Sequence, residues 1–535
     1  MSTPFNAMML PLPSVLNTAS PEPQATASSV GLCFSGGGSR ALTCAMGQLR
    51  GLRALGLLDQ TFALSSVSGG TWASSLYTYL PASISDDEFL GQIQLDPSKI
   101  TIWGNDGNAL DHLPAHNLGQ VPTRLGTLSD LSEILDLKLK YGYPNNDLWQ
   151  GLIGSQVLSL FGLWTPDAQG FDRRYISWTK AVRDAAIARN PGLTAADFIA
   201  VERQRPFLVM NTSLFLSDDA SADLVPFEAN FSLGVRQFFP PSGAQTGGVG
   251  GGLLESFAFT GDYVGEGQPG YVQTTRPARP YSLADIVGSS SAAFAQVAEE
   301  QFPALSGLVP RYSYWPVQGR ASTPSQVYRF ADGGSLENLG LNALLARGLR
   351  KLAVFVNTDE KLRKEGNDIV VSSDLPPLFG LQPWVAGKGY VPYAQDPGSG
   401  SVRLFRHNQV FDTRDFWPLI QQLWQARQNG QSVLVPQSLS VLPNPWFNVP
   451  GGYTVQLLWA YNEFVPNWWN QLSREVQLFI DAESVLDFPM YNTFTQLELS
   501  RYLVNALAHL ASWNVAADAP AGKSTNKELF RALYS

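Results

Sequence analysis

The sequence predicts an α/β fold in which helices cover a layered sheet, and two segments near its start carry this prediction. "VGLCF" (30–34) has the composition of a short buried strand. From Ala41 to Leu55, apolar residues recur at steps of three and four, as on one face of a helix. "TFALSSV" (61–67) indicates a second strand, and the helical pattern of "SGGTWASSLYTYL" (68–80) follows it. Strands and helices that alternate in this way form layered α/β sheets.

Later segments continue the alternation. "RPFLVMNTSLF" (205–215) predicts a third buried strand, and "YSLADIVGSSSAAFAQ" (281–296) a segment that is helical after the serines. "VYRFADGGSLENLGLNALLARG" (327–348) has the pattern of a strand, a turn and a helix. "KLAVFVNT" (351–358) predicts another strand, and "TQLELSRYLVNALAHLASW" (495–513) a long helix near the end of the chain.

The 535 residues divide by composition into a leader and one large domain. We expect residues 1–28 to form a flexible leader and residues 29–535 to form a single domain. Two insertions are expected within it. The first, at about 85–200, is polar and irregular and resembles a cap; the second, at about 365–465, is rich in proline and aromatic residues.

The beginning of the chain lacks the pattern of a secretory signal. No Lys or Arg precedes Arg40, and Pro11 and Pro13 interrupt the apolar run. No apolar stretch reaches the 18 residues or so that a membrane-spanning helix needs. We therefore expect a cytoplasmic or peripherally membrane-associated protein.

Charge and composition exclude several classes of function. The net charge is −9 and no run of Lys or Arg occurs, which argues against nucleic acid as a partner. His112 and His116 have helical spacing, but Pro114 lies between them and no HExxH pattern is present, so no metal or cofactor is expected. The two cysteines cannot form a disulfide framework.

A run of three glycines, Gly36 to Gly38, follows the first strand. It is not a P-loop, because no Gly-Lys-Ser/Thr ends it. It fits the looser dinucleotide pattern Gly36-x-Gly38-x-x-Ala41. That pattern also requires an acidic residue at the end of the second strand, where "SSVSGG" (65–70) stands instead.

Two further strand ends carry reactive residue types. Ser68 lies in a small-x-Ser-x-Gly turn between a strand and a helix, the layout of a nucleophile elbow. Asp332 ends another strand and precedes two glycines. Each residue could instead be an ordinary helix N-cap. Together with the glycine run, however, they supply a nucleophile, a base and oxyanion donors.

These motifs resemble those of a known family. "SGGGSRA" (35–41), "VSGGTW" (67–72) and "ADGGSLENLG" (331–340) are similar to the three signatures of the patatin and cytosolic phospholipase A superfamily of Ser–Asp dyad lipid acyl hydrolases. The phospholipase branch is the more similar, because Arg40 ends the first motif and Thr-Trp continues the second. The resemblance implies a layered α/β/α fold with a central mixed sheet.

The resemblance covers part of the chain. It is clear over about 30–78 and 281–357, where "GSSSAAFAQ" also matches, and fainter over 205–236. Two positions depart from the pattern: Ser66 stands where the elbow usually has Gly, and Gly70 where the phospholipase branch often has Ser.

The resemblance implies roles for the motif residues. Ser68 would be the nucleophile and Asp332 the base that activates it, in a large catalytic domain that cleaves carboxylic esters of lipids through an acyl-serine intermediate. Arg40 would hold a substrate phosphate or organise the loop. The backbone N–H groups expected to form the oxyanion hole belong to Gly37, Gly38 and Gly69.

Other interpretations remain open at this stage. The order Ser68, Asp332, His407 also matches an α/β-hydrolase triad, and His509 lies on the apolar face of the last helix. The same acyl-enzyme could pass its acyl group to an alcohol or amine, which would make the protein an acyltransferase. A catalytically silent lipid-binding protein is the third alternative. The expected partner is a lipid or other acyl ester, with peripheral membrane contact through aromatic residues near the site.

Overall fold

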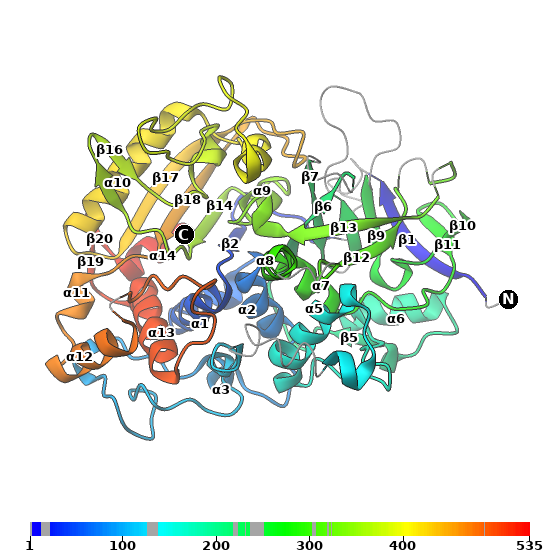
Figure 1. Cartoon of the computed structure of the whole chain (residues 1–535), viewed down its shortest axis with the longest axis horizontal. Coiled ribbons are helices and arrows are strands. Elements are labelled where there is room, and N and C mark those ends of the chain that lie inside the picture. Colours follow the sequence, from blue (N-terminus) through cyan, green and yellow to red (C-terminus); the bar gives the residue numbers. More distant parts are fainter. Residues whose placement is uncertain are drawn as a thin grey trace.

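The computed structural model describes most of the chain (Figure 1). The described residues are 3–11, 22–125, 137–217, 223–230, 232–235, 251–301, 307–317, 320–322, 324–485 and 487–535. The glycine-rich stretch at 242–250 lies outside them.

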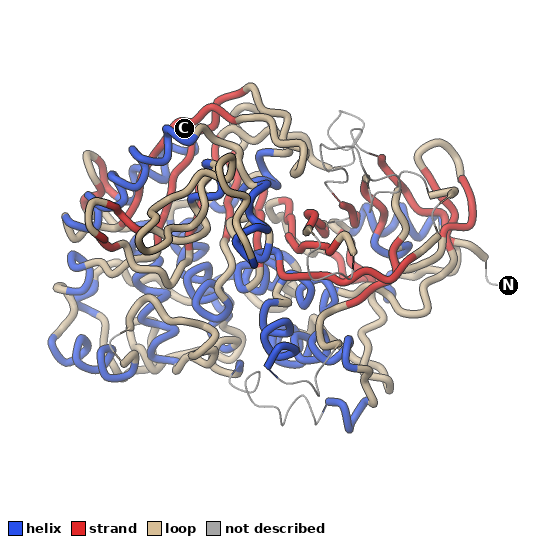
Figure 2. Tube along the Cα trace, turned by 45° about the horizontal axis from the view of Figure 1, so that its top comes forward, coloured by secondary structure: helices blue, strands red, loops and turns tan. Residues whose placement is uncertain are grey.

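A mixed sheet of fourteen strands forms the centre of the described structure, and Figure 2 shows the strands extending across the molecule. The strand order is β10-β11-β1-β9-β8-β7-β6-β3-β2-β14-β18-β17, with β13 paired to β6 and β12 to β13. These strands are β1 (Phe5–Pro11), β2 (Val30–Phe34), β3 (Ala63–Val67), β6 (Phe207–Phe215), β7 (Leu224–Ala229), β8 (Ser232–Val235), β9 (Gly252–Glu255), β10 (Tyr263–Glu266), β11 (Tyr271–Thr274), β12 (Arg311–Tyr314), β13 (Gln326–Asp332), β14 (Lys351–Val356), β17 (Val433–Val441) and β18 (Tyr453–Tyr461). Two-stranded pairs join β4 (Tyr175–Ser177) to β5 (Phe198–Ala200), β15 (Arg363–Glu365) to β16 (Asp368–Val370), and β19 (Pro520–Ala521) to β20 (Ser524–Thr525).

The helices pack on this sheet, and the strands β2 and β3 are connected through α1 as in other layered α/β folds. The α-helices are α1 (Gly38–Ala54), α2 (Gly69–Thr78), α3 (Asp86–Leu90), α5 (Asn145–Ile153), α6 (Lys180–Arg189), α7 (Leu283–Ser290), α8 (Ala293–Gln301), α9 (Leu341–Leu345), α10 (Phe416–Gln428), α11 (Pro466–Trp469), α12 (Arg474–Glu483), α13 (Arg501–Ala516) and α14 (Asn526–Tyr534).

Helices cover both faces of the parallel strands. Phe34 of β2 stacks on Phe355 of β14, which stacks on Phe530 of α14. Helix α13 lies beside α1, as Figure 1 shows. Successive residues of a strand face opposite sides of the sheet, so Gly31 of β2 faces away from the side of Phe34. On that side, the side chain of Leu344 in α9 would be the nearest neighbour of a methyl group on Gly31. The α/β fold with a central mixed sheet is therefore confirmed.

The strand β6 brings two strand ends together. Its first part pairs in parallel with β3, and the last pair joins Val67 to Asn211. Its second part pairs antiparallel with β13, and there Asp332 lies opposite Thr212. Strands β3 and β13 therefore run toward each other along one edge of β6 and end at adjacent positions. Ser68, the residue after Val67, emerges beside Asp332 as a result.

The structure differs from the expected organisation at two places. Residues 5–11, expected in a flexible leader, form β1, which pairs with β9 and β11 and lies among them in Figure 1. The side chains of Phe5, Ala7 and Met9, at every second position, point into a small apolar core. This alternation extends over too few residues to stand out in the sequence. Residues 433–461, within the second expected insertion, supply the sheet strands β17 and β18.

Among the described residues, no helix combines the length and apolar character needed to cross a membrane.

Candidate active site

Ser68 occupies the tight turn between β3 and α2. Its backbone angles are φ 50° and ψ −122°, a conformation that a residue with a side chain rarely adopts. Such a conformation costs about 1–3 kcal/mol and persists only where its surroundings impose it. The hydroxyl of Ser290 in α7 accepts a hydrogen bond from the Ser68 N–H at 3.1 Å and helps to hold the turn. The turn presents the Ser68 side chain, which is 5% exposed, to a cavity.

The Ser68 hydroxyl donates a hydrogen bond directly to Asp332. The distance from Ser68 Oγ to Asp332 Oδ2 is 3.0 Å. No imidazole lies between them. His407 stacks on the indole of Trp446 at 3.9 Å, and His509 is buried in α13. Burial lowers the pKa of His407 to about 4 and that of His509 to about 3, so both rings are neutral at physiological pH.

The Asp332 carboxyl is only 2% exposed and makes two further hydrogen bonds. Oδ1 accepts from the N–H of Gly334 at 2.7 Å, and Oδ2 accepts from the N–H of Ala293, the first residue of α8, at 3.2 Å. Burial raises the pKa of Asp332 to about 6, and these bonds oppose the rise. The carboxylate is therefore ionised at neutral pH and more basic than an exposed aspartate.

The glycine loop packs directly against the turn at Ser68. A methyl group on Gly69 would lie 2.0 Å from the carbonyl oxygen of Gly38. A side chain at Gly70 would lie 2.6 Å from the carbonyl oxygen of Phe34, so this backbone has no room for the serine that the phospholipase branch often has there. The motif at 331–340 also contacts the glycine loop, because the N–H of Gly36 donates to the carbonyl of Asn338 at 3.1 Å.

Three backbone N–H groups at this contact have no hydrogen-bond partner among the described residues. They belong to the candidate oxyanion residues Gly37, Gly38 and Gly69. Gly38 and Gly69 each begin a helix, where the N–H groups lack intrahelical acceptors and the helix dipole favours negative charge. Gly37, with φ 130°, has a backbone conformation that favours glycine.

Arg40 is buried and held by the protein itself. Its Nε donates to the carbonyl of Asn357 at 2.9 Å, and Nη1 donates to the carbonyl of Tyr491. Nη1 also lies 3.5 Å from the Asp359 carboxylate. These contacts tie the first turn of α1 to two distant segments, which fits the loop-organising alternative for Arg40. The guanidinium also borders the cavity above Ser68.

Several residues that support the site carry no clear signal in the sequence. Ser290 and the N–H of Ala293 belong to a segment that the motifs match, but nothing in its pattern assigns them a partner. Ser66, the departure in the elbow, is fully buried and accepts hydrogen bonds from the hydroxyls of Ser74 at 2.6 Å and Thr71 at 3.2 Å. The extra hydroxyl of Ser66, in β3, is therefore satisfied by two side chains of α2.

A cavity of about 440 Å³ opens above Ser68 and Asp332. Part of its wall is aromatic. The ring of Phe294 lies 5.0 Å from that of Phe494, and Phe494 is 59% exposed at the surface. Another part is acidic and consists of Asp359, Glu360 and Asp374. Among the described residues, none from 85–200, the expected cap-like insertion, lines the cavity.

The class of fold is thus α/β with a central mixed sheet, carrying a Ser–Asp pair opposite a glycine loop. Comparison with known proteins adds a sequence relative. Over 131 residues the chain is 43% identical to cytosolic phospholipase A2 zeta from Homo sapiens, a match that covers 24% of this chain and 13% of that protein. The resemblance to the cytosolic phospholipase A branch is therefore confirmed. No family model matches the chain.

Solved structures of human GIVD cytosolic phospholipase A2 also match. One covers 94% of this chain and 60% of its own, with 14% identity and a TM-score of 0.45. A second, in complex with methyl gamma-linolenyl fluorophosphonate inhibitor and terbium chloride, covers 94% and 59%, with 15% identity and a TM-score of 0.40. The chain spans about 60% of the length of these structures.

Proposed function

We propose that this protein is a lipid acyl hydrolase of the phospholipase A or lysophospholipase type, with Ser68 as nucleophile and Asp332 as base. The observation that carries the proposal is the hydrogen bond from Ser68 Oγ to Asp332 Oδ2, 3.0 Å long, at the floor of a cavity. Gly37 and Gly38 also line this cavity, and their N–H groups have no hydrogen-bond partner among the described residues. The similarity to cytosolic phospholipase A2 zeta supports the lipid ester as the substrate class.

The proposed reaction has two halves that share one proton carrier. Asp332 takes the hydroxyl proton of Ser68 as Oγ attacks the ester carbonyl, and then returns it to the departing alkoxide as the C–O bond breaks. In the second half, Asp332 takes a proton from water as the water attacks the acyl-serine. It returns that proton to Ser68 Oγ as the fatty acid leaves. A carboxylate is a weak base, so its burial, which raises the pKa of Asp332 to about 6, favours this role.

The negative charge that develops on the carbonyl oxygen would be stabilised by the glycine loop. The N–H groups of Gly37, Gly38 and Gly69 have no competing acceptor among the described residues. Donors that are already oriented toward such a charge contribute more than donors that must reorganise. Arg40 is proposed to fix this loop through its bonds to the carbonyls of Asn357 and Tyr491, and to border the substrate's polar group.

The aromatic wall supports an apolar acyl chain as the group beside the reacting carbonyl. Phe294 packs against Trp72 of α2, with ring centroids 6.4 Å apart, and against Trp149 of α5 at 6.0 Å. The exposed ring of Phe494 continues this surface outward. Peripheral contact with a lipid surface would be made through such exposed aromatic residues.

A fluorophosphonate probe is expected to label the wild-type protein at Ser68, because the activated hydroxyl would attack phosphorus as it attacks an ester. The labelled peptide is identified by mass spectrometry. Ser68→Ala is expected to take up no label, while Ser66→Ala, two residues earlier in β3, is labelled normally. Absence of labelling in the folded wild-type protein would instead favour a silent lipid-binding protein.

Product analysis separates hydrolysis from acyl transfer. With a lysophospholipid as substrate, the expected product in buffer is the free fatty acid, measured by chromatography. Addition of glycerol or a second lysophospholipid as acceptor is expected to leave free acid as the main product. A product ratio dominated by the acylated acceptor would identify an acyltransferase.

Activity is expected to fall as the pH falls through about 6. Asp332 must be ionised to accept the proton, and burial raises its pKa to about 6, so each pH unit below this value should lower kcat/KM about tenfold. The acid limb is measured from released fatty acid between pH 4.5 and 8.5. Glu360, whose pKa burial raises to about 7, lines the same cavity. The variant Glu360→Gln should therefore still lose activity as the pH falls through about 6. If this acid limb of the pH profile disappears in the variant, the titrating group is Glu360.

A further inference from the structure

Arg50 is a buried cation without a counter-ion. It lies on the buried face of α1 and is 4% exposed. Its Nε donates to the carbonyl of Leu90 at 2.7 Å. Among the described residues, no carboxylate lies within ion-pair distance of the guanidinium, and no other acceptor meets its Nη atoms. Burial alone lowers the pKa of Arg50 to about 10, so the group stays charged at neutral pH.

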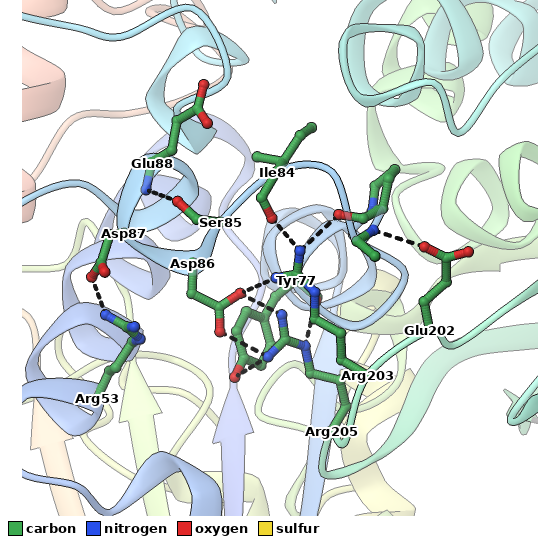
Figure 3. Close-up of polar contacts among 12 residues, drawn as sticks. Arg53, Tyr77, Ile84, Ser85, Asp86, Asp87, Glu88, Glu202, Arg203 and Arg205 are labelled. Atoms are coloured by element: carbon green, nitrogen blue, oxygen red, sulfur yellow. Dashed lines mark hydrogen bonds and ion pairs between the residues drawn. The ribbon is translucent and has the colours of Figure 1, made fainter.

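The carboxylates of α3, the helix that ends at Leu90, are engaged elsewhere, and Figure 3 shows the partners of Asp86 and Asp87. At the start of α3, Asp86 pairs with Arg203 at 2.7 Å and with Arg205 at 2.6 Å. Asp87 pairs with Arg53, which is exposed on the last turn of α1. The next residue, Glu88, accepts from the ring of His116 at 2.6 Å.

The Arg50 guanidinium lines a polar cavity of about 330 Å³, which we call the Arg50 cavity. Its other walls include the side chains of His112, Asn117 and Asn505. The carboxylates of Asp87, Glu88 and Asp106 also border it. None of the described residues that line it also lines the cavity above Ser68.

Two donors converge on one backbone position of this cavity. A methyl group on Gly91 would lie 3.1 Å from Arg50 Nη2 and 3.0 Å from Asn117 Nδ2. Gly91 has φ 78°, a conformation that favours glycine. The absence of a side chain there leaves room beside the guanidinium and the amide, whose Nδ2 also donates to the carbonyl of Glu88 at 3.3 Å. A guanidinium fork matches the two oxygens of a carboxylate or phosphate group.

We propose that the Arg50 cavity binds a small polar molecule through a singly charged oxyanion group, a phosphodiester or a carboxylate, held by Arg50 and Asn117. A single charge is required because Asp87, Glu88 and Asp106 at the border repel a dianion. The site is separate from the active site. Arg50 follows Gly38 by twelve residues of the same helix, about 18 Å along its axis.

The experiment uses the full-length protein and soluble probes. Glycerophosphocholine supplies a phosphodiester and acetate supplies a carboxylate. Inorganic phosphate at pH 8 serves as the dianion, and glycerol serves as an uncharged control. Binding is measured by isothermal titration calorimetry and by the rise in Tm. We expect glycerophosphocholine or acetate to bind more tightly than the dianion, and glycerol not to bind. Binding seen only with phosphatidylcholine vesicles, and lost in the variants below, would assign the phosphodiester to a lipid headgroup and also support the site.

Two variants and one control test the site. Arg50→Gln is expected to weaken binding by at least about 30-fold, because the charged fork is lost. Asn117→Asp places a carboxylate beside the unpaired cation, so it should raise the Tm of the free protein and abolish the binding of the probes. Arg183→Gln removes a similar charge from α6, where neither Arg183 nor its partner Asp184 lines the cavity, and should bind as the wild type does.

The proposal is overturned if neither a soluble probe at about 10 mM nor the phosphatidylcholine vesicles bind the wild-type protein, or if folded Asn117→Asp binds as tightly as the wild type. It is also overturned if inorganic phosphate is the tightest ligand. Should Arg50→Gln fail to fold, the Asn117→Asp result decides alone. Aspartate retains the Oδ1 acceptor for the N–H of Gly119 and loses only the 3.3 Å bond from Nδ2 to the carbonyl of Glu88.

Discussion

Replacement of Asp332 by Asn is expected to lower kcat by about four to six orders of magnitude while the protein stays folded. The amide keeps the shape of the side chain and can still contact Ser68 Oγ, which lies 3.0 Å from Oδ2 in the wild type. It cannot accept the hydroxyl proton. The rate of fatty acid release under saturating lysophospholipid measures the loss, and circular dichroism with the Tm measures the fold.

Matched variants make this result specific. Ser68→Ala should lose about as much activity, and the double variant should lose no more than either single one, because the two groups act as a unit. Asp374→Asn removes another carboxylate, one that is half-buried, from the same cavity and should change kcat by less than about tenfold. If His407→Ala abolishes turnover while Asp332→Asn does not, the base is the histidine and the dyad is wrong.

Substitution of Gly69 by Ala is expected to lower kcat by about two to three orders of magnitude. The added methyl group would lie 2.0 Å from the carbonyl oxygen of Gly38 and 2.7 Å from its nitrogen. Backbone atoms cannot yield as a flexible side chain does, so the glycine loop must move away from Ser68. The N–H groups of Gly37 and Gly38 would then miss the oxyanion.

The control for this substitution is Gly192→Ala, since nothing lies within 4 Å of a methyl group at Gly192. It should retain wild-type turnover and Tm. For Gly69→Ala, we expect a lower kcat, slower labelling by the fluorophosphonate and a lower Tm. A wild-type rate of labelling in this variant would mean that the loop does not supply the donors.

Local sequence determines the elements that build the site. The strand at 30–34 and the helix after it form as β2 and α1. They are predictable because the apolar period that defines the helix and the glycines that end the strand are local features of one short segment. The strand before Ser68 and the one that ends at Asp332 are likewise predicted by composition alone. The resemblance then names the residues, but it does not give their geometry.

Segments whose structure depends on distant partners are predicted less well. The segment 281–296, expected to be helical only after its serines, also forms α7 before Ser291. The helix α8 follows as a separate helix, because the chain breaks at Ser291 and the N–H of Ala293 turns to Asp332. Strand β17 includes Pro436 and lies at an end of the strand order. Its pattern is weak because only part of each face is buried there.

The sequence by itself determined which strand ends carry Ser68, Asp332 and the three glycines. Only the tertiary structure decided that these ends meet. Ser68 and Asp332 are 264 positions apart, and they become neighbours because β3 and β13 end at adjacent positions along β6. The basicity of Asp332 is decided in the same way. Burial raises its pKa to about 6, and burial depends on all the segments that pack around the carboxyl. The unpaired charge of Arg50 is equally invisible in the sequence, because a missing partner can be recognised only when the neighbours are in place.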